Sequence, residues 1–261
     1  MKIAIIILTG LFIFSSCEKV IKVDLNDTEK RIIIQGNYSG DGQVVDVKIS
    51  LTSSYFDNST SPNLDNAVVT ISDQTGSPQN VPSIGNGKYQ LLNYAPTAGA
   101  TYTMTVVYDG IEYKASSILN STIAQDPMHI EYEVEEPGPF GEEGEEGFVA
   151  YINYTDPAST TDFYQVVTHV NGEQMEKYVS NDKFINGSTV IDYAYGFLKS
   201  GDTINIDLRT INEATHDYYV ELSTLNDGNV ATPANPKYQW SNRGLGYFSV
   251  FGSSVREHII P

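Results

Sequence analysis

Apolar and polar residues alternate along most of this chain, and that period of two limits its fold more than any other feature. The alternation is clearest at residues 44–51, where Val45, Val47 and Ile49 are separated by polar side chains. Successive side chains of a β-strand point to opposite faces, so this spacing buries one face of each strand and exposes the other. We therefore predict a mainly β fold built from antiparallel strands.

Turn signals separate the alternating segments of the first half at short intervals. The dipeptide Asp109-Gly110 lies between the segments 102–108 and 111–113. It supplies the positive φ that a two-residue hairpin turn requires. Further glycine-containing turns occur at 40–42, 76–78 and 85–87. Strands of this length and spacing predict an immunoglobulin-like or fibronectin-like antiparallel β-sandwich over residues 31–123.

The alternation stops at Asp126-Pro127 and then resumes, which indicates a domain junction. The mature chain is long enough for one large β domain or two smaller ones, and we favour two. The second antiparallel β domain is expected over residues 124–261. It carries one short helix at about 212–225, where apolar residues recur at steps of three and four and Asn212 is available as the N-cap.

The N-terminus has the order of a secretion signal that ends in a lipid-attachment site. Lys2 is followed by an apolar run to Phe14, two serines and Cys17. The run is shorter than the roughly 20 residues that a membrane-spanning helix needs. We predict a signal peptide at 1–16, lipidation of Cys17 and a lipidated tether at 17–30. The alternative is an ordinary secretory signal in which this cysteine is incidental.

Composition excludes several classes of function. The chain has 33 Asp and Glu against 15 Lys and Arg, a net charge of −18, which argues against a nucleic acid as partner. Cys17 is the single cysteine, so its lipidation would leave no thiol for a disulfide, a nucleophile or a zinc site. The 18 tyrosines suit both half-buried strands and exposed recognition surfaces, and composition does not separate these uses.

No motif for catalysis or cofactor binding was found in the sequence. The Gly36–Gly40 segment places its serine one position too late for a nucleophile elbow. A phosphate-binding glycine loop is missing, and the histidines are isolated rather than one helical turn apart. They are His129, His169, His216 and His258. We predict no cofactor, no metal site and no enzymatic activity; a hydrolase with paired carboxylates is the less favoured alternative.

Three segments are candidates for recognition or modification. Tyrosine, tryptophan and arginine dominate interface energetics, which makes Tyr238, Trp240 and Arg243 candidate partner contacts. The alternative places Trp240 in the core. The acidic loop is a further candidate for a basic partner or for calcium, against a plain solvated loop. Its glutamates are Glu142, Glu143, Glu145 and Glu146.

Thr203 lies in the sequence Asp202-Thr203-Ile204, which resembles the short pattern used for O-glycosylation in the periplasm of Bacteroidota. A plain edge-strand threonine is the competing interpretation. The pattern is short, so Thr203 is a candidate O-glycosylation site only.

Several segments together resemble one family. They are "CEKVIKVDLNDTEKRIIIQG", "AVVTISDQTG", "YTMTVVYDGIEYKASS", "NYTDP" and the closing "PANP…GLGYFSVFG". In this order they resemble the Bacteroidota outer-membrane lipoproteins of domain-of-unknown-function family 4249. The resemblance implies an outer-membrane location and a gene that lies close to genes for TonB-dependent transporters. It implies no established activity and supplies no catalytic residues.

The sequence therefore predicts a non-enzymatic outer-membrane lipoprotein, periplasmic or surface-exposed and held to the membrane by its N-terminal lipid. It would act as an accessory binding or scaffolding module for a TonB-dependent transporter or another envelope complex. The alternative is a surface lipoprotein that captures a glycan or another ligand directly.

Overall fold

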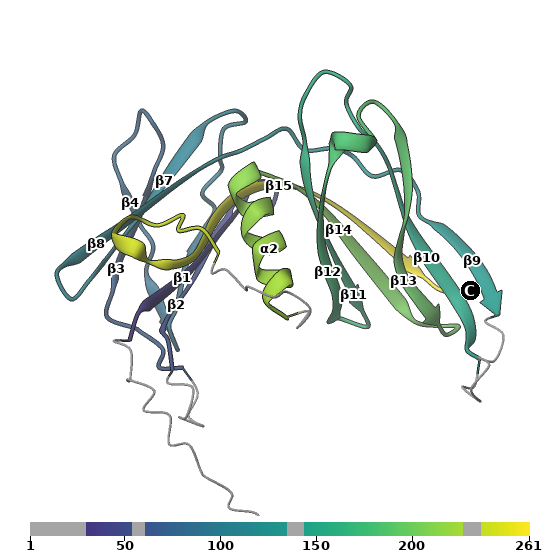
Figure 1. Cartoon of the computed structure of the whole chain (residues 1–261), viewed down its shortest axis with the longest axis horizontal. Helices are drawn as coiled ribbons and strands as arrows, with labels where there is room; N and C mark the ends of the chain where they lie inside the picture. The colour runs from purple at the N-terminus through teal and green to yellow at the C-terminus, as the bar shows by residue number, and fades with distance from the viewer. Residues whose placement is uncertain (1–29, 54–60, 135–143, 227–235) are drawn as a thin grey trace, which may run out of the picture.

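The fold is mainly β with one α-helix, as predicted. The structure is a computed structural model and describes residues 30–53, 61–134, 144–226 and 236–261. The strands form three sheets, and the helix α2 (Glu213–Asn226) lies in front of them near the middle of the molecule (Figure 1). No helix in these ranges is long and apolar enough to cross a membrane.

The largest sheet has eight strands and runs through both halves of the molecule. Its order is β12-β11-β14-β15-β1-β2-β6-β5. In chain order its strands are β1 (Ile32–Ser39), β2 (Val44–Leu51), β5 (Ser83–Gly85), β6 (Lys88–Leu92), β11 (Phe163–Val170), β12 (Glu173–Asn181), β14 (Thr203–Ile211) and β15 (Leu245–Ile259).

Two smaller sheets complete the fold. The four-stranded sheet has the order β4-β3-β7-β8, and the three-stranded sheet has the order β13-β10-β9. Their strands are β3 (Val68–Ser72), β4 (Gln79–Asn80), β7 (Thr101–Tyr108), β8 (Ile111–Ile118), β9 (His129–Val134), β10 (Glu146–Thr155) and β13 (Thr189–Leu198). Short 3₁₀ turns are η1 (Asp182–Phe184) and η2 (Ser241–Arg243).

Each small sheet packs on one half of the large sheet, which gives two hydrophobic cores. The first core includes Ile34 of β1 in the large sheet and Met104 of β7 in the four-stranded sheet. The second joins Ile152 of β10 to Ile206 of β14. The domain boundary predicted at residue 124 stays a prediction. The C-terminal segment contributes to both cores, because Phe248 of β15 lies in the first core and Ile260, just after β15, lies in the second.

The long strand β15 connects the two halves by changing its partner along its length. Its first part, from Leu245 to Phe251, pairs in parallel with β1. Its second part, from Gly252 to Ile259, pairs antiparallel with β14. In Figure 1 this strand is the yellow ribbon that passes behind α2 from one half to the other. The first and last strands of the sequence therefore lie side by side in the middle of the large sheet.

Two local predictions are confirmed. The turn between β7 and β8 pairs Tyr108 with Ile111, and Asp109 and Gly110 both have positive φ, at 49° and 74°. The predicted helix at 212–225 is α2, and the side chain of Asn212 caps it by accepting a hydrogen bond from the backbone N–H of Thr215 at 2.8 Å. In both cases the decisive chemistry is local, so the sequence was sufficient.

Gly246 provides a test of the parallel contact between β1 and β15. It has φ of +97°, and a Cβ at this position would lie 2.1 Å from the carbonyl oxygen of Ile34. We expect Gly246→Ala to destabilise the fold by about 3 kcal/mol or more, through backbone strain together with overpacking. The unfolding free energy can be measured by denaturant titration followed by circular dichroism.

Gly201→Ala is the matched control, because Gly201 has a similar φ of +91° but no neighbouring atom within 4 Å of the added Cβ. It should cost only the backbone strain, about 1 kcal/mol. Equal losses for the two variants would show that the close approach at Gly246 is not needed for stability.

Candidate functional site

The predicted contact residues Tyr238 and Arg243 meet at the surface, and Arg31 joins them. The ring of Tyr238 lies near two guanidinium groups, with its centroid 4.9 Å from Cζ of Arg31 and 5.8 Å from Cζ of Arg243. Arg31 Nη1 donates a hydrogen bond to the Tyr238 hydroxyl at 3.2 Å, and Nη2 donates to the Arg243 carbonyl. We call Arg31, Tyr238 and Arg243 the Tyr238 patch.

The electrostatics of the Tyr238 patch suit an acidic partner. The hydrogen bond from Arg31, with the positive charges of both arginines, lowers the pKa of Tyr238 from its ordinary value. Within the described ranges, neither guanidinium forms an ion pair with a carboxylate. Tyr238 is 41% exposed. An exposed aromatic ring flanked by two cations can therefore receive an anionic group and an apolar surface together.

Trp240 is buried in the first core and anchors the segment 238–243 to it. It is 2% exposed, and its indole N–H donates to the carbonyl of Ile34 at 3.1 Å. The sequence allowed Trp240 to be either a surface contact or a core residue. The structure places it in the core, so it is not a surface contact. A buried indole finds a hydrogen-bond acceptor because an unpaired N–H would be costly.

The loop that follows Trp240 is fixed against the edge strand β8. Ser241 Oγ accepts a hydrogen bond from the backbone N–H of Lys114 at 2.8 Å, and Asn242 Nδ2 donates to the Glu112 carbonyl at 2.7 Å. Asn242 and Arg243 both have positive φ, at 52° and 59°. Non-glycine residues in this conformation are strained, and such strain persists only where surrounding contacts hold it.

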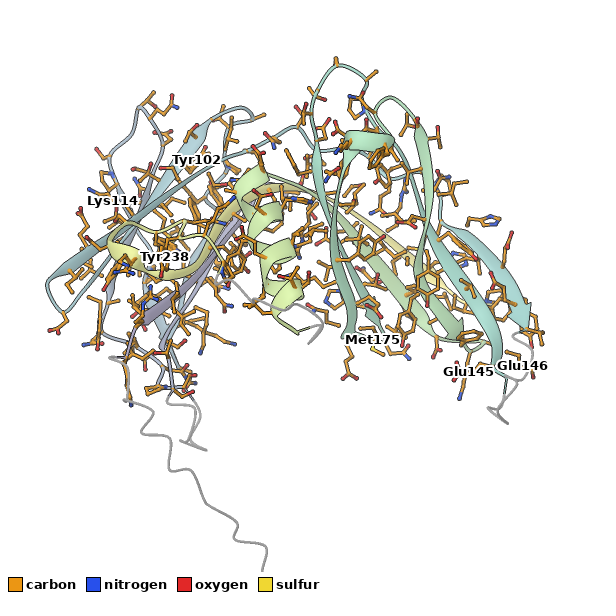
Figure 2. The ribbon with its side chains drawn as sticks, viewed as in Figure 1. Tyr102, Lys114, Glu145, Glu146, Met175 and Tyr238 are labelled. Carbon is orange, nitrogen blue, oxygen red and sulfur yellow. The ribbon has the colours of Figure 1, made fainter. Side chains whose placement is uncertain are left out.

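The other predicted site residues lie elsewhere. Figure 2 places Glu145 and Glu146 near the start of β10, at the opposite end of the molecule from Tyr238. Cys17, Glu142 and Glu143 lie outside the described residues.

Thr203 opens β14, and its backbone N–H donates to Asn171 Oδ1 at 3.0 Å. It is half-buried there, in a strand with partners on both sides. Its glycosylation stays a prediction.

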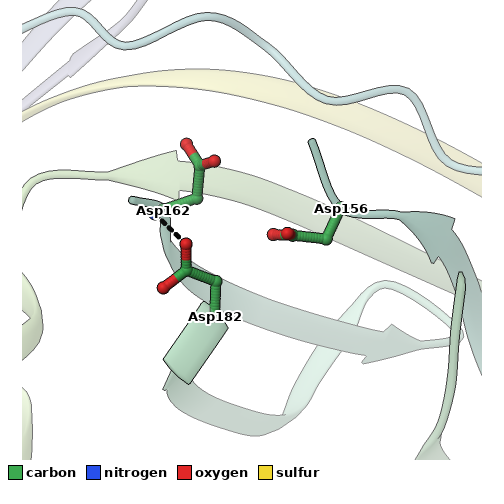
Figure 3. A group of neighbouring side chains, drawn as sticks. All are labelled: Asp156, Asp162 and Asp182. Atoms are coloured by element: carbon green, nitrogen blue, oxygen red, sulfur yellow. Dashed lines mark hydrogen bonds between the residues drawn. The ribbon is translucent and has the colours of Figure 1, made fainter. Parts of the chain in front are cut away.

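Three buried carboxylates form a cluster that no pattern in the sequence indicates. Asp156 follows β10, Asp162 precedes β11 and Asp182 follows β12 (Figure 3). They are 2%, 7% and 4% exposed, and one carboxylate oxygen from each lies within 4.8 Å of the others. Asp156 and Asp162 are six positions apart, and Asp182 lies 20 positions further along the chain. The three meet because the ends of β10, β11 and β12 lie close together.

Hydrogen bonds orient each carboxylate of this aspartate cluster. Asp156 accepts from the backbone N–H of Gly187 at 2.9 Å and from the Tyr164 hydroxyl, whose pKa is raised by burial and by that bond. Asp182 accepts from the backbone N–H of Asp162 at 2.8 Å. Three oxygen donors at this spacing could hold a hard cation such as Ca²⁺. Their hydrogen bonds also organise the loops at this end of the sheets.

Burial raises the pKa of Asp162, and the neighbouring carboxylates of Asp156 and Asp182 raise it further. A raised carboxyl pKa means that ionisation costs the folded state stability, so the cost grows as pH rises above the ordinary value near 4. In buffer with chelator, we expect Asp162→Asn to raise the melting temperature at pH 7. The gain should shrink as pH falls toward 4, which calorimetry across this range measures.

Asp202→Asn is the control, because its expected change in melting temperature has the opposite sign. Hydrogen bonds from Asn171 and from the backbone N–H of Lys199 lower the pKa of Asp202, so its charged form favours the fold. This variant should melt lower than the parent chain at pH 7. A lower melting temperature for Asp162→Asn as well would contradict the repulsion described for the aspartate cluster.

The sequence profile of a domain of unknown function (DUF4249) matches residues 18–257. The chain belongs to this family. The match covers strands from all three sheets, including most of β15. No curated protein sequence matches the chain.

Two solved structures show a distant likeness to this fold. One is a cytokine receptor complex, with 10% identity and a TM-score of 0.27 over 87% of this chain and 95% of the other. The second is a segment of two fibronectin type-III domains from chicken tenascin, with 12% identity and a TM-score of 0.22 over 82% and 92%. Both TM-scores are low, and nothing about this chain is inferred from either likeness.

Proposed function

We propose that this chain is a non-enzymatic lipoprotein of the outer membrane of Bacteroidota, which binds or scaffolds a partner in the envelope. The partner in this proposal is a TonB-dependent transporter or another envelope complex. The observation that carries the proposal is the Tyr238 patch, an exposed tyrosine beside two arginines that form no ion pair with a carboxylate among the described residues.

The position of the patch relative to the predicted lipid supports contact with a membrane protein. Arg31 is the second described residue of the chain, 14 positions after Cys17. An extended segment of that length spans at most about 50 Å. The Tyr238 patch therefore belongs to the part of the fold that a lipid on Cys17 would keep near the membrane surface.

The residue types in the Tyr238 patch, and the anchoring of its segment by Trp240, support a role in protein recognition. Tyrosine and arginine are enriched among the residues that dominate binding energy. Trp240 fixes the segment from inside the first core, so little conformational entropy would be lost on binding. In this proposal the first half is an immunoglobulin-like or fibronectin-like sandwich, whose rigid sheets present the loop at 236–244 to the partner.

A pull-down from native membranes in mild detergent tests the proposal. We expect the tagged parent chain to recover a β-barrel transporter in stoichiometric amount. The double variant Tyr238→Ala/Arg243→Ala should reduce recovery at least tenfold, because it removes the aromatic anchor and one cation. Recovery is measured by quantitative mass spectrometry.

Two further variants serve as controls. Tyr132→Ala removes a tyrosine of similar exposure, 55%, in the other half of the molecule and should leave recovery unchanged. Cys17→Ala should move the chain to the soluble fraction and abolish recovery, because the lipid anchor is lost. Recovery of the lipoprotein alone by the parent chain would rule out a stable complex.

A further inference from the structure

A groove crosses the face of the eight-stranded sheet that carries α2. Two neighbouring pockets of about 360 Å³ and 320 Å³ form it, and they share Asn37, Asp46 and Tyr247. The first pocket reaches Lys177 on β12, and the second reaches Ile84 on β5. We call this the junction groove, because its centre lies where β1 and β15 join the two halves.

The junction groove is long and runs across the strands. It extends from β12 at one edge of the sheet to β5 at the other, which is seven strand intervals. At about 4.8 Å for each interval, the strands that it crosses span about 34 Å along the sheet. A groove of this shape fits an extended chain of linked units better than a compact small molecule.

The floor of the junction groove is held in place by buried contacts. Tyr247 is 6% exposed, and its hydroxyl pairs with the side-chain amide of Asn37 at 3.2 Å. Arg209 lies over the Phe251 ring at 4.6 Å and donates from Nε to Asp207 at 2.7 Å. These side chains are therefore positioned before any ligand arrives, which lowers the entropy lost on binding.

The junction groove has a positive charge in an acidic protein. Its lining contains Lys48, Lys88, Lys177 and Arg209 against Asp46 and Asp207, a balance of +2 in a chain of net charge −18. The three lysines form no ion pair with the acidic side chains in the described ranges.

The amino group of Lys177 is positioned by Tyr219 of α2, to whose hydroxyl it donates at 2.7 Å. Cations without carboxylate partners along a groove suit a ligand that brings its own carboxylates.

We propose that the junction groove binds an acidic oligosaccharide, a chain of sugars that carry carboxylates. The lysines pair with those carboxylates, and the side-chain amides of Gln90 and Gln174 hydrogen-bond to sugar hydroxyls. An extended peptide fits less well, because strand addition needs a peptide that runs along an edge strand, whereas the junction groove runs across the strands. The net charge of the protein disfavours a nucleic acid.

Isothermal titration of the full-length lipidated chain in detergent tests this site with hexagalacturonate as the probe. Maltohexaose is the neutral comparison and hexaglutamate the acidic peptide comparison. We expect binding of hexagalacturonate and at least tenfold weaker binding of the other two. Lys177→Gln at one end and Lys48→Gln/Lys88→Gln at the other should each weaken binding about tenfold, because charge-assisted hydrogen bonds are lost.

Lys114→Gln is the matched control, because Lys114 is an exposed lysine on the four-stranded sheet, paired with Glu112 and outside the groove. It should leave the affinity unchanged. Absence of hexagalacturonate binding, equal binding of hexaglutamate, or unchanged affinity in both groove variants would overturn the proposal. The Tyr238→Ala/Arg243→Ala variant should keep full affinity, so the outcome is independent of the partner complex proposed above.

Discussion

The parallel pairing of β1 with β15 is the constraint on which the rest of the structure depends. The carbonyl of Ile34 lies near the start of this pairing, where Ile34 is opposite Gly246, and it accepts a hydrogen bond from the indole N–H of Trp240. Because Gly246 has no side chain, the two strands approach closely there. β15 then continues to pair with β14, so the same contact joins the first core to the second. Without it, the large sheet would fall into two separate pieces.

Both proposed binding surfaces owe their geometry to this contact. Tyr238 and Arg243 of the patch lie on the segment that Trp240 attaches to the first core. Arg31, the residue just before β1, donates a hydrogen bond to Tyr238. The junction groove has its centre at Tyr247 of β15 and Asn37 of β1. The two surfaces have different chemistry: the patch is an exposed aromatic ring beside two cations, and the groove is a long cleft whose lining carries lysines and side-chain amides.

The aspartate cluster shows how tertiary structure creates chemistry that no sequence pattern contains. Asp156, Asp162 and Asp182 each stand beside a different strand, with spacings that match no cation-binding loop. Their strands belong to two different sheets, whose ends meet. Burial and mutual repulsion then change the acidity of Asp162, although in sequence it is one acidic residue among 33 Asp and Glu.

The sequence by itself determined the features that depend on neighbouring residues. Alternation fixed which faces of β2 are buried, Asp109-Gly110 fixed a hairpin, and Asn212 fixed the start of α2. Tertiary structure alone decided which strands lie side by side, because pairing between residues as distant as Ile33 and Leu245 leaves no periodic trace in the sequence. For the same reason, only the structure placed Trp240 in the core and brought Arg31 to Tyr238.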